Sequence, residues 1–379
     1  FNGSGNIAAT SFNGIPFYTD AASNSMYTHD VSSTDDGATG NTAYGFTAMD
    51  SITSGDANTA VGYRAGVNIT SGAQNTFLGQ DAGRGLTVGN YNVAIGYEAL
   101  YTEDAGGFSV AIGRRALKAQ NTTGNPYNIA IGYHTAQSIT TGLYNTAIGG
   151  EALETNIDGD NNTAIGYKAL KSFEADTDGH GDNTAIGSSA MQNVTTGTSN
   201  TAIGKTAMGN GSTTGDNNIA IGVSAGLQLS SGGDNILIGN FAGDNLDTGS
   251  RNVAIGRNAL SAENSEGRNV AIGYEALKSQ NASSDVYNVA VGYEAGRLIN
   301  TGANNTIVGG LAGDQVTTAG ENVLIGYDSG GALTTGGSNV SVGTYALNAE
   351  DEHGRNVAVG HETLGTLNAG AHGHNTAVA

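Results

Sequence analysis

One short pattern of apolar and polar positions returns along most of the chain. Each copy begins with Asn and continues with a β-branched residue, Ala, Ile or Val, and Gly. Two variable positions follow, and then usually Ala and an apolar residue or Gly. We number the positions of a copy from its Asn as position 1. Three representative copies place positions 1, 4 and 5 at Asn92, Ile95 and Gly96, at Asn162, Ile165 and Gly166, and at Asn252, Ile255 and Gly256.

The copies are spaced almost evenly. The sequence holds 20 of them over residues 41–379, and fourteen of the 19 intervals are 17 residues long. A regular short period of β-branched and apolar residues predicts stacked coils with one strand of about 4–6 residues each. Seventeen residues are too few for a helical repeat unit. We therefore expect an all-β fold, a parallel β-solenoid (β-roll) of about 20 coils with a 17-residue repeat.

The alternation of side chains predicts how each strand is packed. Positions 2 and 4 point to one side of a strand, and positions 3 and 5 point to the other. Both sets are apolar or small, so we expect both faces to be buried. One face would fill the interior of the coil, and the small Ala and Gly face would let a second layer approach closely. This arrangement favours several parallel chains around a common axis.

The Asn and Gly positions are interpreted as structural. Asn follows a polar turn, tolerates turn conformations and, stacked in successive coils, predicts a ladder of side-chain amides. Position 1 is Asn in every copy except Ser109. The Gly at position 5 predicts a positive φ or a close backbone contact where the strand bends.

The motif Asn-(Thr/Val)-Ala-Ile-Gly-x-x-Ala resembles the head repeats of trimeric autotransporter adhesins. The longer segments between copies are more similar to repeat arrays in phage tail fibres. The resemblance covers residues 41–379 and implies a homotrimer, with three chains around one axis. The 17-residue period is longer than that of the adhesin heads, and no coiled-coil stalk or membrane anchor is visible. A virion surface and a cell surface therefore both stay open as the extracellular location.

The remaining segments differ from the repeat. Residues 1–40 lack it and are predicted to form an N-terminal cap or a joint, whereas residues 41–379 form the solenoid. The chain starts at Phe1 and stops within a motif, so we expect a piece of a longer protein. Residues 91–120 resemble 251–280, as expected of duplicated multi-coil cassettes. Longer coils place their extra residues in four loops, which are candidate ligand contacts: 118–127, 171–182, 278–287 and 365–374.

Composition and charge disfavour several classes of function. The net charge of −20 disfavours binding to nucleic acid, and the absence of Cys excludes a disulfide framework. No apolar run is long enough to insert into a membrane. The weak motif at Asp176, Asp178 and Asp182 is a candidate Ca²⁺ loop, although a solvated acidic loop is the simpler interpretation.

No catalytic motif is present, so we expect no enzyme and no cofactor. Tyr recurs at position 6, where an exposed aromatic stripe is a weak candidate for contact with sugar rings. The representative residues are Tyr97, Tyr133, Tyr167 and Tyr274.

Three hypotheses for the function follow. The first is a structural and adhesive extracellular fibre, the shaft or head of a phage tail fibre or of a cell-surface adhesin. Its partners would be two further copies of the chain and a glycan or protein receptor on a cell surface. The second is a self-polymerising extracellular filament. The third is an ice-binding solenoid, which the interrupted row of Thr at position 2 supports only weakly.

Overall fold

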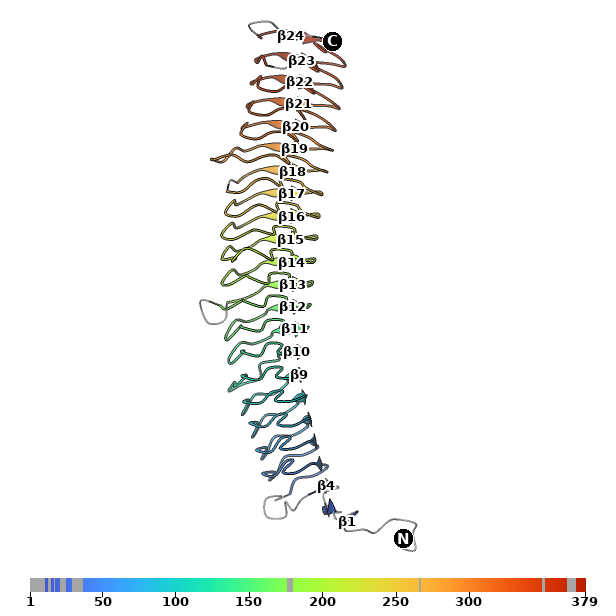
Figure 1. Cartoon of the computed structure of the whole chain (residues 1–379), viewed down its shortest axis with the longest axis vertical. Coiled ribbons are helices and arrows are strands. Elements are labelled where there is room, and N and C mark those ends of the chain that lie inside the picture. The colour runs from blue at the N-terminus through green and yellow to red at the C-terminus, as the bar shows by residue number, and fades with distance from the viewer. Residues whose placement is uncertain are drawn as a thin grey trace, which may run out of the picture. The chain divides into compact units, whose positions relative to one another are not determined.

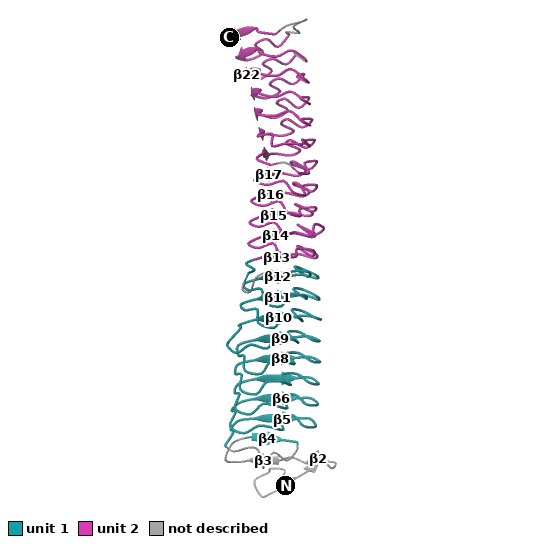
Figure 2. Ribbon diagram, turned by 90° about the vertical axis from the view of Figure 1, so that its left-hand side faces the viewer, with its two compact units in different colours: residues 1–182 teal, residues 183–379 magenta. Residues whose placement is uncertain are grey.

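The computed structural model describes residues 11–12, 15–16, 18–20, 25–28, 37–175, 180–265, 267–349, 352–366 and 373–379. Within these ranges all regular structure is β-strand and no helix is present. The chain divides into two compact units, Phe1–Asp182 and Asn183–Ala379, drawn in teal and magenta in Figure 2. None of the described residues belongs to a helix long and apolar enough to cross a membrane.

The first unit contains twelve of the strands. Its first four are β1 (Ser11–Phe12), β2 (Ile15–Pro16), β3 (Tyr18–Asp20) and β4 (Ser25–Tyr27). The other eight each start at position 2 of a repeat and are β5 (Thr42–Tyr44), β6 (Thr59–Val61), β7 (Thr76–Leu78), β8 (Val93–Ile95), β9 (Val110–Ile112), β10 (Ile129–Ile131), β11 (Thr146–Ile148) and β12 (Thr163–Ile165).

The second unit contains twelve strands, all of them in repeats. They are β13 (Thr184–Ile186), β14 (Thr201–Ile203), β15 (Ile219–Ile221), β16 (Ile236–Ile238), β17 (Val253–Ile255), β18 (Val270–Ile272), β19 (Val289–Val291), β20 (Thr306–Val308), β21 (Val323–Ile325), β22 (Val340–Val342), β23 (Val357–Val359) and β24 (Thr376–Val378).

Successive coils within each unit pair in parallel and in register. In β8 and β9, Val93 lies opposite Val110 and Ile95 lies opposite Ile112, so equal repeat positions are neighbours. The same pairing recurs along both units, and Figure 1 shows one strand for each coil. The prediction of a parallel β-solenoid with about 20 coils and a spacing of about 17 residues is therefore confirmed.

The alanines fill the interior of each coil, which corrects the expected packing of the strand faces. Ala94 at position 3 is fully buried, as are Ala99 and Leu100 at positions 8 and 9. The side chain at position 12 is buried as well, for example that of Leu86. The β-branched residues at positions 2 and 4 instead point outward, and those of β8 are half-buried. The small Ala at position 3 leaves room in the 17-residue coil for the larger buried side chains at positions 9 and 12, such as Leu100 and Leu86.

The strands are also shorter than expected. Each repeat strand has three residues, not four to six. The Gly at position 5 has a positive φ, between 126° and 146° in the described copies up to Gly360, and this conformation ends the extended segment. A Cβ added to Gly96 would lie 2.6 Å from the carbonyl oxygen of Gly113 in the next coil. Both predicted reasons for this Gly, the positive φ and the close backbone contact, are confirmed.

In some coils a large residue at position 3 is accompanied by Gly at position 9. Phe77 stands at position 3, where most copies have Ala. Position 9 is Gly83 in the same coil and Gly66 in the preceding coil. A Cβ on Gly66 would lie 2.5 Å from the Phe77 ring. Leu237, with Gly226 and Gly243, repeats the exchange in the second unit. The volume of the interior is therefore kept although its residues change.

The segment predicted as a cap or joint contributes strands to the same sheet. β3 pairs with β4 in an antiparallel manner, and β4 pairs in parallel with β5, where Met26 lies opposite Thr42. β1 and β2 form a separate antiparallel pair. The first regular coil thus has a neighbour from residues 1–40, while the role of that segment as a cap or a joint stays a prediction.

Candidate functional site

A buried ladder of Asn side chains joins the coils. The backbone N–H of Asn92 donates to Oδ1 of Asn75 at 2.8 Å, and Nδ2 of Asn92 donates to the carbonyl oxygen of Gly106 at 2.9 Å. The N–H of Asn162 donates in the same way to Asn145, and that of Asn252 to Asn235. The predicted ladder is confirmed. Each amide oxygen accepts from the next coil, so the side chain replaces a backbone acceptor at the turn.

The ladder changes partners where position 1 is Ser109. The Ser109 hydroxyl accepts a hydrogen bond from Gln120 Nε2, and Gln120 Oε1 accepts one from Asn128. Gln120 also donates to the carboxylate of Glu103, which is fully buried and accepts from Gly106 N–H as well. A polar network thus replaces the apolar packing of other coils, and its members satisfy one another.

The outward face of the sheet is uncharged. In all 20 copies positions 2 and 4 hold only Thr, Val, Ile, Leu or Tyr. Ile95, Ile165 and Ile255 are half-buried on this face, while Leu78 and Ile129 have exposed fractions of 46% and 38%. A chain with a net charge of −20 therefore presents a continuous uncharged surface within each unit.

The predicted Tyr stripe lies on the surface, at one edge of this face. Tyr97, Tyr133, Tyr167 and Tyr274 are all exposed. Two of these rings have neighbours: the Arg114 guanidinium lies 5.8 Å from the Tyr97 ring centroid, and Tyr274 stacks on Tyr293 at 5.3 Å. Sugar contact at these residues stays a prediction.

A second aromatic column is one that sequence reasoning missed. The residue before position 1 is aromatic in four successive copies of the first unit, and all four rings are exposed: Tyr91, Phe108, Tyr127 and Tyr144. Their centroids are 4.7, 5.2 and 5.8 Å apart and the rings are nearly parallel. We call these four residues the aromatic stack. Aligning the copies on the residue before each Asn would have found it.

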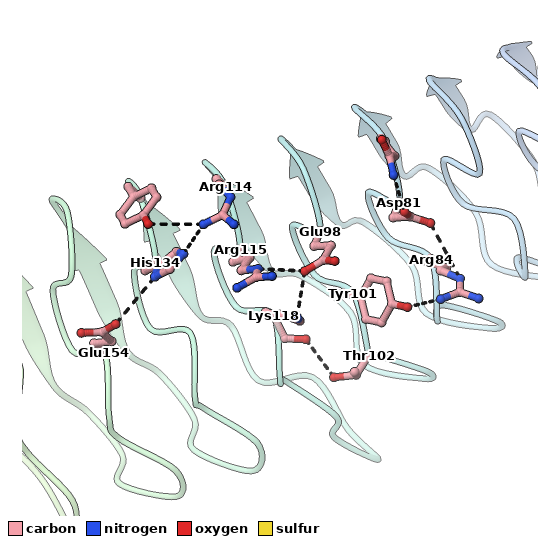
Figure 3. Close-up of polar contacts among 12 residues, drawn as sticks. Asp81, Arg84, Glu98, Tyr101, Thr102, Arg114, Arg115, Lys118, His134 and Glu154 are labelled. Carbon is pink, nitrogen blue, oxygen red and sulfur yellow. Dashed lines mark hydrogen bonds and ion pairs between the residues drawn. The ribbon is translucent and has the colours of Figure 1, made fainter.

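Charged side chains at positions 7 and 10 form an ionic ladder in the first unit, which we define as Asp81, Arg84, Glu98, Arg115 and Lys118 (Figure 3). Glu98 pairs with Arg115 at 2.9 Å and with Lys118 at 2.8 Å. Partial burial acts to raise the pKa of Glu98, but hydrogen bonds from Lys118, Tyr97 and Arg115 outweigh it and hold the pKa at about 2. These pairs link neighbouring coils.

The candidate Ca²⁺ loop is only partly within the described structure. Asp176 and Asp178 lie outside the described residues, and Asp182 is exposed. The N–H of Asp182 donates to the carbonyl oxygen of Asp160 at 3.1 Å. In the part of the chain that the structure describes, no three His, Asp or Glu side chains are close enough together to hold a metal ion.

Cavities lie beside the irregular coils. Lys118 and Ala119, from the loop 118–127, line a cavity of about 360 Å³ with Thr102 and Ser138. Asn281, from the loop 278–287, lines a groove of about 680 Å³ in the second unit. The structure thus brings two of the four inserted loops to concave surfaces, as expected of candidate ligand contacts; ligand binding there stays a prediction.

The geometry is that of a regular scaffold with an uncharged outer face and polar grooves beside its inserted loops. Comparison with known proteins gives no further assignment: no family model matches the chain, and no curated protein matches its sequence.

Proposed function

We propose that the chain is a structural and adhesive segment of an extracellular fibre, without catalytic activity. It would form the shaft or head of a phage tail fibre or of a trimeric adhesin on a cell surface. Three copies would pack around one axis, and the fibre would hold a binding region away from the surface that carries it. Its receptor would be a glycan or a protein on another cell.

The uncharged outward face carries this proposal. Residues such as Ile95 and Ile129 expose apolar surface on a chain whose other positions bear 34 acidic groups. Chains with a net charge of −20 repel one another, so copies associate most favourably where no charge is brought together. Burying such an apolar strip is also the main favourable term in association.

The repeated ladder supports a mechanical role. Within each unit, successive coils are bonded by parallel strand pairs and by the Asn side chains, so many equivalent hydrogen bonds act along the direction in which the coils stack. In repeat proteins of this kind stability is a sum over units and their interfaces. A long array of such coils is suited to resisting shear and proteolysis.

Native mass and particle shape test the proposal. We expect light scattering after size exclusion to give about 114 kDa, which is three times the chain mass of 38.0 kDa. Electron micrographs of that peak should show thin rods. A monomer of 38.0 kDa would contradict the packing of copies, and open-ended polymers would favour the filament instead.

Charge placed on the outward face gives a sharper test. Ile95→Asp and Ile165→Asp should each abolish trimer formation, because a carboxylate would be buried between copies. Val88→Asp is a matched control, since Val88 is 45% exposed but lies at position 14, outside this face. Survival of the trimer in both Ile variants would exclude the proposed interface.

A further inference from the structure

A polar groove on the second unit is distinct from the uncharged face. Its volume is about 680 Å³, within the usual range for small-ligand sites. Gly211 and Asn281 lie at its two ends, in coils that start at Asn200 and Asn269. At a coil spacing of about 4.8 Å the groove is about 19 Å long.

Hydrogen-bonding side chains line the groove in two rows. Gln228 and Asn245 occupy position 11 of successive coils. The second row, at position 13, contains Ser230, Asp247, Asn264 and Asn281. A ligand that extends along the coils would therefore meet similar polar groups at regular intervals.

Several of these groups have no partner within the described residues. The side chains of Gln228, Asn264 and Asn281 make no hydrogen bond there. Asn245 uses Nδ2 to donate to the carbonyl oxygen of Ser261 at 2.8 Å, and the Ser230 hydroxyl donates to the Asp247 carboxylate. Each free amide offers both a donor and an acceptor, which matches hydroxyl groups that also do both.

Two small residues line the groove. Ala262 takes position 11 in the coil after those of the longer Gln228 and Asn245. Gly211 belongs to a coil of 18 residues, and a Cβ on it would collide with the carbonyl oxygen of Leu229. A larger side chain at position 262 would therefore fill the space that a ligand needs.

The charge of the lining selects against anions. None of the residues that line the groove is basic, and Asp247 adds a negative charge. We infer that the groove binds an extended, uncharged oligosaccharide, whose successive sugar hydroxyls are read by the amides of successive coils. This inference specifies the adhesive part of the proposed function and rests on it.

Titration of the assembled chain of residues 1–379 with cellotetraose and with tetra-N-acetylchitotetraose tests the inference, with tetragalacturonate as the anionic comparison. We expect saturable binding of at least one neutral tetrasaccharide in calorimetry and none of the anionic one. Asn264→Ala together with Asn281→Ala should weaken binding at least tenfold. Asn121→Ala is a matched control that should change nothing, since Asn121 holds the same position 13 in the duplicated cassette.

Ala262→Trp tests whether the groove itself is needed for binding, independently of its amide hydrogen bonds. It removes no polar group but fills the groove, so it should abolish binding while the native mass stays unchanged. Assembled chain that binds neither neutral tetrasaccharide, or binding that survives both sets of changes, would overturn the inference. Loss of assembly in the unmutated chain would instead contradict the proposed fibre, so the two failures are distinguishable.

Discussion

Residues 91–120 in the first unit and 251–280 in the second share most of their interior residues but have different outer side chains. Glu103 and Glu263 are both fully buried at position 12, and Gln120 and Gln280 are buried beside them. On the outside, Tyr91 and Phe108 of the aromatic stack are replaced by Arg251 and Arg268. Glu98 of the ionic ladder is replaced by Asn258.

This comparison distinguishes the interior residues, which determine the coil, from the outer residues, which determine its surface chemistry. Interior positions and the Asn ladder meet similar neighbours in most coils, so their replacement must preserve volume and hydrogen bonding, as the Ser109 network and the Phe77 exchange do. Outer positions contact water and one or two neighbours, so they are free to change from aromatic to basic. Surface chemistry, including any binding specificity, can therefore differ between the units without change to the coil.

The largest expected effect comes from the interior. Phe77→Ala should lower the free energy of unfolding by about 3–5 kcal/mol, because it opens a cavity. Adding Gly66→Leu and Gly83→Leu should restore most of the loss, since Leu100 already occupies this position with a φ of 49°. Thermal or denaturant unfolding measures both variants.

The same exchange can be tested in the second unit. Leu237→Ala, with and without Gly226→Leu and Gly243→Leu, should reproduce the loss and the rescue. Hydrogen exchange should localise each loss to the unit that carries the change, because coils interact with their neighbours only. A rescue that fails in both units would contradict the volume exchange.

The Asn ladder should respond equally in the two units. Asn75→Ala and Asn235→Ala each remove the acceptor of a buried N–H and the donor to a buried carbonyl oxygen of Gly89 or Gly249. We expect each to cost about 1–3 kcal/mol per unsatisfied group. Denaturant midpoints measure the loss, and a twofold difference between the two variants would show that the ladder is not equivalent in both units.

Loss of an exposed ring should destabilise the first unit, which has the aromatic stack, more than the second. Tyr127→Ser breaks two ring pairs and should cost about 1–2 kcal/mol. Tyr287→Ser is the counterpart in the second unit, where the described ring contact is the Arg268 guanidinium at 5.6 Å, and it should cost less. Equal losses in calorimetric unfolding would indicate that the exposed rings contribute no stacking energy.

The smallest expected effect concerns the pH dependence of the ionic ladder. The folded pKa of Glu98, about 2, lies below the ordinary value of 4.5, so ionised Glu98 stabilises the fold above pH 4.5. That contribution is lost as the pH falls through 2. Glu98→Gln should therefore lower stability by about 1 kcal/mol at neutral pH after solvent screening, and the difference from the unmutated chain should vanish near pH 2.

An exposed pair in the second unit serves as the control. Asp234 and Arg251 are 3.7 Å apart with side chains that are 53% and 60% exposed, so Asp234→Asn should change unfolding very little at any pH. A pH-dependent loss in this variant as large as that of Glu98→Gln would show that burial is not the cause of the difference.

The sequence alone determined the fold class and the backbone pattern. The 17-residue period requires stacked coils, and its β-branched residues require strands that pair in register, so repeat position could be assigned to sheet position without coordinates. The Asn ladder and the positive φ of Gly96 followed from residue chemistry, because few other residues satisfy those positions. The relation between Phe77 and its flanking Gly residues was also present in the sequence.

Only the tertiary structure decided which strand face lies inside. Positions 2 to 5 are all small or apolar, so hydrophobicity could not distinguish the faces. The closed coil places Ala94 inside with larger side chains such as Leu100, and leaves Ile95 on the outside. The groove between Gly211 and Asn281 likewise depends on five successive coils lying beside one another. Concavity arises from three-dimensional stacking, whereas a linear pattern records only the order of the side chains.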